Sequence, residues 1–130
     1  MLAIDKTVFA FGVVGTAGFL ADASIVAGLA ALGVGPITAQ CVAFFVAVHV
    51  TWLGNRSWTF RGQGTRKTLL QEWLLYTSAN GLGWLVNNCV YISLILSMPL
   101  VAKHPVWAVA VGSIAGLFFN YAAAKRVVFL

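Results

Sequence analysis

The chain has 130 residues, of which 61% are hydrophobic and only 8% are charged, and its formal net charge is +5. A soluble domain of this size could not hide so much apolar surface, because small folds leave much of their surface in water. The composition therefore excludes a soluble globular domain and predicts an integral membrane protein.

Four apolar segments follow one another along the chain, and each is near or above the roughly 20 residues that a helix needs to cross the hydrocarbon core. Strands of a closed barrel would alternate with a period of two over about ten residues, whereas these segments are longer and apolar on all sides. The expected fold is all-α, with one membrane domain over residues 1–130. We expect transmembrane helices at about 8–32, 37–55, 69–98 and 106–124, with a polar segment at 56–68.

Basic residues are divided unevenly between the segments that connect these helices. Of the eight Lys and Arg residues, Lys103 alone lies between the third and fourth helices, and none lies between the first and second. Because basic residues are retained on the cytoplasmic side, we expect both termini and the 56–68 segment to be cytoplasmic. The basic cluster also suits attraction to anionic headgroups, worth about 1 kcal/mol per residue near the surface. A loop this short is no nucleic-acid-binding domain, so we expect no nucleic acid as a partner.

The first and third helices carry nearly the same string, at Gly18–Asp22 and Gly83–Asn87, 65 positions apart. With the same offset, Phe11 matches Tyr76. An offset of 69 relates the ends of the second and fourth helices, pairing Thr51 with Asn120, Trp52 with Tyr121, Arg56 with Lys125 and Phe60 with Phe129. The chain is therefore interpreted as two helical hairpins of like sequence, which would form a parallel repeat because each hairpin crosses the membrane twice. Chance similarity between apolar hairpins is the alternative.

Asp22 is the only acidic residue deep inside an apolar segment. It lies about fifteen residues into the first helix, near the midplane at 1.5 Å per residue. A charge there costs roughly 2.5 kcal/mol or more, so we expect Asp22 to face a cavity or a partner. It could line a site for a sugar headgroup, couple a proton, or bond a neighbouring helix as a structural contact.

Polar residues also recur at helical spacing in the other three segments. Asn80, Gly83 and Asn87 share one face of the third helix, and their amides suit sugar hydroxyls and interhelical bonds equally well. Asn120 continues a stripe with Gly112 and Gly116, a spacing that favours close helix packing over ligand contact.

The second helix carries His49, Trp52 and Arg56 on one face. Arg56 lies at the expected cytoplasmic edge, where a guanidinium could clamp a phosphate through two parallel hydrogen bonds. The alternative is an anchor that extends to lipid headgroups. His49, about two turns deeper, could bind sugar, relay a proton or be a structural histidine.

Several kinds of chemistry have no matching pattern in the sequence. It contains no Walker loop and no Ser-His-Asp or paired-carboxylate arrangement. Cys41 and Cys89 have no His or Cys beside them at metal-ligand spacing. We therefore expect no catalytic residues, no metal and no cofactor, which means that the protein is not an enzyme.

Two of these stretches, Gly-Phe-Leu-Ala-Asp at Gly18–Asp22 and Asn-Arg-Ser-Trp-Thr-Phe at Asn55–Phe60, resemble the GtrA-like family of small four-helix membrane proteins. The resemblance covers essentially the whole chain. It implies translocation of a polyprenyl-phosphate-linked sugar across the bacterial inner membrane, and related helices anchor some dolichol-phosphate-mannose-type synthases. The sequence departs from the family pattern at Thr51, where Asn is common, and at Ala124-Lys125, which replaces a second Asn-Arg.

The residues and the resemblance together predict a multi-pass inner-membrane protein that flips this lipid for cell-surface polysaccharide glycosylation. The predicted phosphate-binding residues are Arg56, Lys125 and Arg126. The predicted polar path for the headgroup consists of Asp22, His49, Thr51, Asn55, Asn80, Asn87 and Asn120. Four helices make a thin wall around a hydrated headgroup, so we expect a homodimer surrounded by membrane lipids. Two alternatives are a non-transporting anchor or partner of a polyprenyl-phosphate glycosyltransferase, and a small proton-coupled multidrug exporter.

Overall fold

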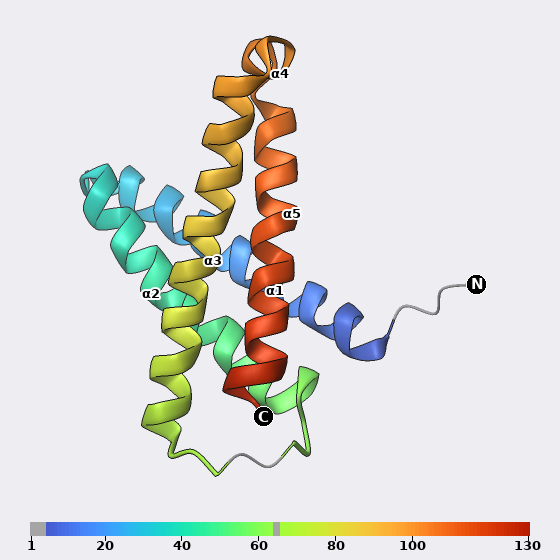
Figure 1. The fold of residues 1–130 in the computed structure, drawn as a ribbon. Helices are drawn as coiled ribbons and strands as arrows, with labels where there is room; N and C mark the ends of the chain where they lie inside the picture. Colours follow the sequence, from blue (N-terminus) through green and yellow to red (C-terminus); the bar gives the residue numbers. More distant parts are fainter. Residues whose placement is uncertain (1–4, 64–65) are drawn as a thin grey trace. The chain divides into compact units, whose positions relative to one another are not determined.

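The computed structural model describes residues 5–63 and 66–130, so positions 64 and 65 of the predicted polar segment lie outside the described residues. Throughout the described residues the regular structure is helical, and four helices are long and apolar enough to cross a membrane. The prediction of an all-α protein with four spans is confirmed. The helices form two hairpins, residues 5–63 and 66–130, and each hairpin is a compact unit (Figure 1).

The first hairpin consists of α1 (Lys6–Ala31), α2 (Pro36–Gly54) and a π-helical turn, η1 (Asn55–Thr59). The helix α1 begins at a cap in which the Asp5 carboxylate accepts a hydrogen bond of 3.1 Å from the backbone N–H of Thr7. This bond satisfies one of the N–H groups that have no partner inside the helix.

A tight turn joins α1 to α2, and its conformation follows from the glycines in the sequence. Gly33 adopts a φ of +81°, which a residue without a Cβ reaches without steric cost. The N–H of Gly33 donates to the Ala30 carbonyl, and the N–H of Val34 donates to the Leu29 carbonyl, each over 3.0 Å. This is a Schellman motif. Pro36 then occupies the first turn of α2, where its missing N–H costs nothing.

The second hairpin begins with a well-defined cap. The Thr68 hydroxyl accepts from the N–H of Gln71 over 3.2 Å, and the Gln71 side chain accepts from the N–H of Thr68 over 3.1 Å. This capping box fixes the start of the third long helix, which ends just before Met98-Pro99 because a residue that precedes proline disfavours helical backbone. The elements are α3 (Leu69–Ser97), α4 (Pro99–Lys103), α5 (Val106–Ala123) and a second π-helical turn, η2 (Ala124–Val128).

The two π-helical turns occupy the same place in the repeat, 69 positions apart. The Asn55 carbonyl accepts from the N–H of Phe60 over 2.8 Å, and the Ala124 carbonyl accepts from the N–H of Phe129 over 2.9 Å. The sequence predicts that the second and fourth helices end at Asn55 and Ala124, whereas helical backbone continues four residues further in each hairpin. Such turns are rare and often lie at functional sites.

An aromatic pair closes the same end of each hairpin. The rings of Phe11 and Phe60 are 6.4 Å apart at 65°, and those of Tyr76 and Phe129 are 6.0 Å apart at 63°. Both pairs have the edge-to-face geometry that aromatic rings prefer. The sequence offsets match Phe11 with Tyr76 and Phe60 with Phe129, so the repeat describes equivalent contacts in the two hairpins.

A glycine brings the two helices of each hairpin together at equivalent positions. A Cβ atom added to Gly18 would overlap the Thr51 side chain, and one added to Gly83 would overlap the Asn120 side chain. Both glycines are buried. Small residues at such crossings allow the close approach on which helix pairs in lipid depend.

The contact between α3 and α5 gives a direct test of this packing. A Cβ at Gly112 would lie 2.7 Å from the Asn87 carbonyl oxygen and 2.6 Å from Asn87 Oδ1. We expect Gly112→Ala to lower the stability of the folded protein by about 1–3 kcal/mol, because the backbone must move apart. Heating the detergent-solubilised protein and following its monodisperse fraction measures this loss.

The matched control for this experiment is Gly81→Ala, because a Cβ there would meet no atom within 4 Å. Alanine is also the better helix former by about 1 kcal/mol, so the control should be neutral or slightly stabilising. Equal losses in Gly81→Ala and Gly112→Ala would contradict the close contact at Gly112.

In the first hairpin, Gly54 packs against Val14. The corresponding residues of the second hairpin are Ala123 and Ala79. A Cβ at Gly54 would lie 2.9 Å from Val14 Cγ1. We therefore expect Gly54→Ala to destabilise the protein and Val14→Ala to relieve that loss, with a coupling of roughly 1 kcal/mol in a double-mutant cycle. The stability of each variant is measured by thermal unfolding. If the losses of stability in the two single variants simply add up in the double variant, the two residues do not compete for the same space.

Candidate functional site

The turn η1 exposes one cation and buries polar groups behind it. Arg56 is exposed, whereas Asn55 and Thr59 are buried. The Thr59 hydroxyl donates to Asn55 Oδ1 over 2.8 Å, and the Ser57 hydroxyl donates to the Leu53 carbonyl over 2.5 Å. The Asn55–Thr59 hydrogen bond therefore holds the buried side of the turn, and Arg56 is exposed on its outer side.

The turn η2 repeats this pattern with different residues. Ala124 and Val128 are buried, and Lys125 and Arg126 are exposed. The Lys125 ammonium lies 5.7 Å from the centroid of the Tyr121 ring, a distance at which a cation is attracted to an aromatic face. Each hairpin thus ends in a turn that exposes basic side chains at corresponding positions.

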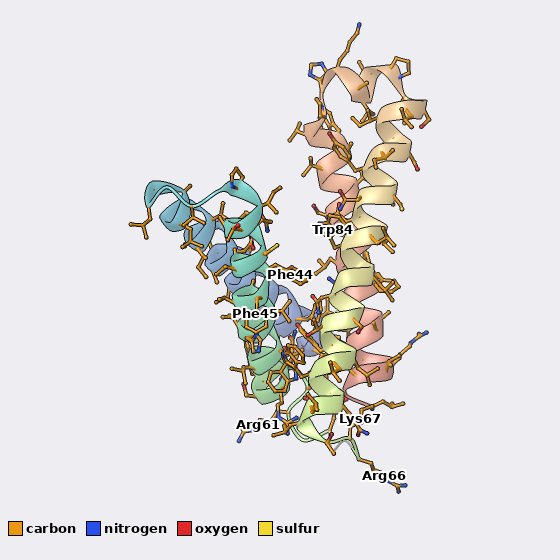
Figure 2. The ribbon with its side chains drawn as sticks, turned by 90° about the vertical axis from the view of Figure 1, so that its left-hand side faces the viewer. Phe44, Phe45, Arg61, Arg66, Lys67 and Trp84 are labelled. Atoms are coloured by element: carbon orange, nitrogen blue, oxygen red, sulfur yellow. The ribbon has the colours of Figure 1, made fainter. Side chains whose placement is uncertain are left out.

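More basic residues lie at the same end of the second hairpin. Lys67 Nζ donates to the Leu130 carbonyl over 3.3 Å, which ties the start of α3 to the segment that follows η2. Arg66 and Lys67 lie beside the first turn of α3 (Figure 2). Glu72 in that turn is fully buried, and a carboxylate near a helix N-terminus is favoured by the helix dipole.

Asp22 forms a pair with a residue that the sequence analysis does not single out. Gln40 Nε2 donates to Asp22 Oδ1 over 3.3 Å. Gln40 is exposed and Asp22 is half-buried. Gln40 lies in the second turn of α2, and Asp22 lies nine residues before the end of α1, so the pair is in the half of the hairpin near the turn. The signal in the sequence is an amide near the start of the second apolar segment.

The two predicted path residues on α2, His49 and Thr51, bond to their own helix. His49 Nδ1 lies 2.7 Å from the Phe45 carbonyl oxygen, and the two rings are 4.5 Å apart. Phe44 and Phe45 are exposed on α2 (Figure 2). The Thr51 hydroxyl donates to the Ala47 carbonyl over 3.0 Å. These bonds hold both side chains in place, and their contact with a ligand stays a prediction.

Two of the three predicted asparagines of the second hairpin lie where α3 crosses α5. Asn87 packs against Gly112, and Asn120 packs against Gly83. Asn120 Oδ1 is buried and has no hydrogen-bond partner among the described residues. Asn80 instead donates to the Tyr76 carbonyl of its own helix over 2.9 Å. The crossing therefore involves both Asn87 and Asn120, whereas the amide of Asn80 bonds within its own helix.

Within residues 5–63 and 66–130, no group of three or more His, Cys, Asp or Glu side chains could hold a metal ion. Cys41 and Cys89 are both exposed.

The sequence matches one known protein family over nearly its whole length. The sequence model described as GtrA/DPMS, transmembrane domain, matches residues 10–129, which include both hairpins and both π-helical turns. The chain belongs to the GtrA/DPMS transmembrane-domain family. The family predicted from Gly18–Asp22 and Asn55–Phe60 is thus confirmed, and the four apolar helices make this GtrA/DPMS member a multi-pass membrane protein. Among curated proteins, none matches the sequence significantly.

The buried hydrogen bond in η1 of this GtrA/DPMS member can be tested against the second hairpin, which has Ala124 and Val128 at the corresponding positions. We expect Thr59→Val to cost about 1 kcal/mol, because it removes the donor to Asn55 Oδ1. The loss in the double variant with Asn55→Ala should be smaller than the sum of the single losses.

Thermal unfolding in detergent measures these stabilities. The matched control is Ser57→Ala, because Ser57 is exposed and bonds only its own helix among the described residues. Its stability should stay within about 0.5 kcal/mol of the parent. A Thr59→Val variant as stable as this control would show that the Asn55–Thr59 bond does not hold the turn.

Proposed function

We propose that this protein binds a polyprenyl-phosphate-linked sugar and moves it across the bacterial inner membrane, for use in cell-surface polysaccharide glycosylation. One observation carries the proposal. In a chain of the GtrA/DPMS family, two corresponding π-helical turns expose Arg56 in one hairpin, and Lys125 and Arg126 in the other.

The cations are the groups that would hold the phosphate. Both turns lie at helix C-termini, where the unpaired carbonyl groups carry partial negative charge. The backbone therefore does not attract an anion at these positions, and the attraction must come from side chains. The guanidinium of Arg56 can form two parallel hydrogen bonds with phosphate oxygens, and Lys125 and Arg126 offer positive charge at the corresponding turn of the second hairpin.

The outer surface of each hairpin suits the lipid part of the proposed substrate. Large apolar side chains such as Phe19, Leu20 and Trp84 are exposed, and in a bilayer they would contact acyl chains. A prenyl tail can stay among those chains during transport, so only the headgroup needs polar groups. We assign these groups to the residues of the predicted path, namely Asp22, His49, Thr51 and Asn55 in the first hairpin and Asn80, Asn87 and Asn120 in the second.

The distribution of basic residues along the chain predicts the orientation of the protein in the membrane. We propose that the ends that carry the π-helical turns are cytoplasmic, because seven of the eight basic residues belong to the segments predicted to lie on that side. The phosphate would then be bound where lipid-linked sugars are made. We also propose a homodimer, which would thicken the wall around the headgroup, and we assign no catalytic step to the chain.

The family also includes the membrane domain of DPMS proteins, which favours a second candidate function. In that case the chain would be a membrane partner of a polyprenyl-phosphate glycosyltransferase and would transport nothing. Reconstitution separates the two functions, because an anchor moves no lipid when it is purified alone. The exporter alternative would require Asp22 to couple proton entry to efflux, so Asp22→Asn should then abolish protection of growing cells against cationic dyes.

The test of the transport proposal uses liposomes that contain the purified protein and a polyprenyl-phosphate hexose labelled in the sugar. Appearance of the sugar at the opposite face is followed with a membrane-impermeant reagent. We expect Arg56→Ala to slow transport about tenfold or more, because a lost charge-assisted pair is worth at least 1.4 kcal/mol. Arg56→Lys should recover part of the rate, since it keeps the charge and loses the second hydrogen bond.

The matched control is Arg61→Ala, because Arg61 is exposed beyond η1 and lies outside the proposed site (Figure 2). This variant should transport at nearly the rate of the parent. Transport by Arg56→Ala at the parent rate would refute the phosphate site. A parent protein that moves no lipid but co-purifies with a glycosyltransferase would support the anchor instead.

A further inference from the structure

The pair formed by Asp22 and Gln40 is too far from Arg56 to share one headgroup with it. Gln40 and Arg56 are sixteen positions apart along α2 and η1, which corresponds to about 24 Å at 1.5 Å per residue. A sugar joined directly to its phosphate is much shorter than this. A lipid-linked monosaccharide bound at Arg56 therefore cannot contact Asp22 and Gln40 at the same time.

The second hairpin shows that this pair is not needed to build a hairpin. Its residues at the corresponding positions are Asn87 and Val109. Asn87 packs against the backbone of Gly112, and Val109 is an exposed apolar residue. The first hairpin instead keeps a carboxyl group and an exposed amide in the span, where polar side chains are costly and usually functional.

The hydrogen-bonding capacity of the pair fits sugar hydroxyls. Gln40 uses one amide hydrogen on Asp22 Oδ1. One further amide hydrogen, the Gln40 carbonyl oxygen and Asp22 Oδ2 remain, which gives one donor and two acceptors. Neighbouring hydroxyls on a sugar both donate and accept, so they match this set. A phosphate matches it poorly, because it repels a carboxylate.

We infer that Asp22 and Gln40 form a sugar-binding subsite, which the headgroup reaches after it leaves the phosphate site at Arg56. This inference rests on the proposed function. It adds Gln40 as a specificity-determining residue and divides the path into two stations, one of which binds phosphate and the other hydroxyl groups. The preference of the protein for glycosylated lipid then resides in the first hairpin.

The experiment compares two probes, polyprenyl phosphate and polyprenyl-phosphate glucose, for binding to the full chain in nanodiscs. The quantity measured is the ratio of their dissociation constants, which is insensitive to the fraction of protein that is folded. We expect the parent to prefer the glycosylated lipid about tenfold, as one or two net hydrogen bonds allow. A panel with mannose and galactose in place of glucose covers other hexoses.

The variants Gln40→Val and Asp22→Asn introduce the residues of the second hairpin at these positions. Each should lower the preference for the glycosylated lipid about tenfold and leave the binding of bare polyprenyl phosphate unchanged. Arg56→Ala should weaken the binding of bare polyprenyl phosphate more than that of the glycosylated lipid, because a sugar held by Asp22 and Gln40 lies too far from Arg56 for a direct contact. The matched control is Thr16→Val, because Thr16 is exposed on α1 and its hydroxyl donates to the Gly12 carbonyl of the same helix.

The remaining outcomes separate the inference from the proposed function. A parent that binds both lipids equally, or a Gln40→Val variant that keeps the preference, would overturn the subsite and leave the phosphate site standing. If a variant no longer dimerises but keeps the same ratio of dissociation constants, Asp22 and Gln40 belong to an interface between two copies of the chain and the subsite is refuted. A parent that binds no lipid of the panel would refute the proposed function and the subsite together.

Discussion

The close approach of two helices at buried glycines governs the structure of each hairpin. Helices in lipid are not driven together by the hydrophobic effect, so their association depends on short van der Waals contacts and a few polar bonds. Gly18 meets the Thr51 side chain, and Gly83 meets the Asn120 side chain. Because the contact is this close, a methyl group at either glycine would push the two helices apart. The side chains that these helices position would then move as well.

The polar residues are positioned by this contact, since they lie one turn beyond it. Asp22 follows Gly18 by four positions, as Asn87 follows Gly83. Asp22 accepts a hydrogen bond from a side chain, whereas Asn87 lies against the backbone of Gly112. Asp22 and Asn87 therefore occupy equivalent positions on two similar helices but have different surroundings. The reason is that the facing helices, α2 and α5, carry different residues opposite them.

The sequence repeat predicts the positions that correspond in the two hairpins, because both offsets can be read from matched strings. It pairs Phe11 with Tyr76, and the structure shows an equivalent ring contact for each. The π-helical turns could not be predicted, since hydropathy does not distinguish a bond to the fourth residue from one to the fifth. Gln40 was missed for a related reason: its significance depends on the facing helix, and amides suit packing and ligands equally.

Shared packing and divergent polarity bear on how the chain works. The two π-helical turns have the same length and burial, yet the first encloses the Asn55–Thr59 hydrogen bond and the second encloses only Ala124 and Val128. The span of the first hairpin likewise holds a carboxyl–amide pair where the second has Asn87 and an apolar residue. A common ancestor hairpin explains the shared contacts, because packing tolerates few changes. It does not explain added polar groups, which are costly in lipid, whereas the proposed passage of a sugar headgroup along the first hairpin would explain them.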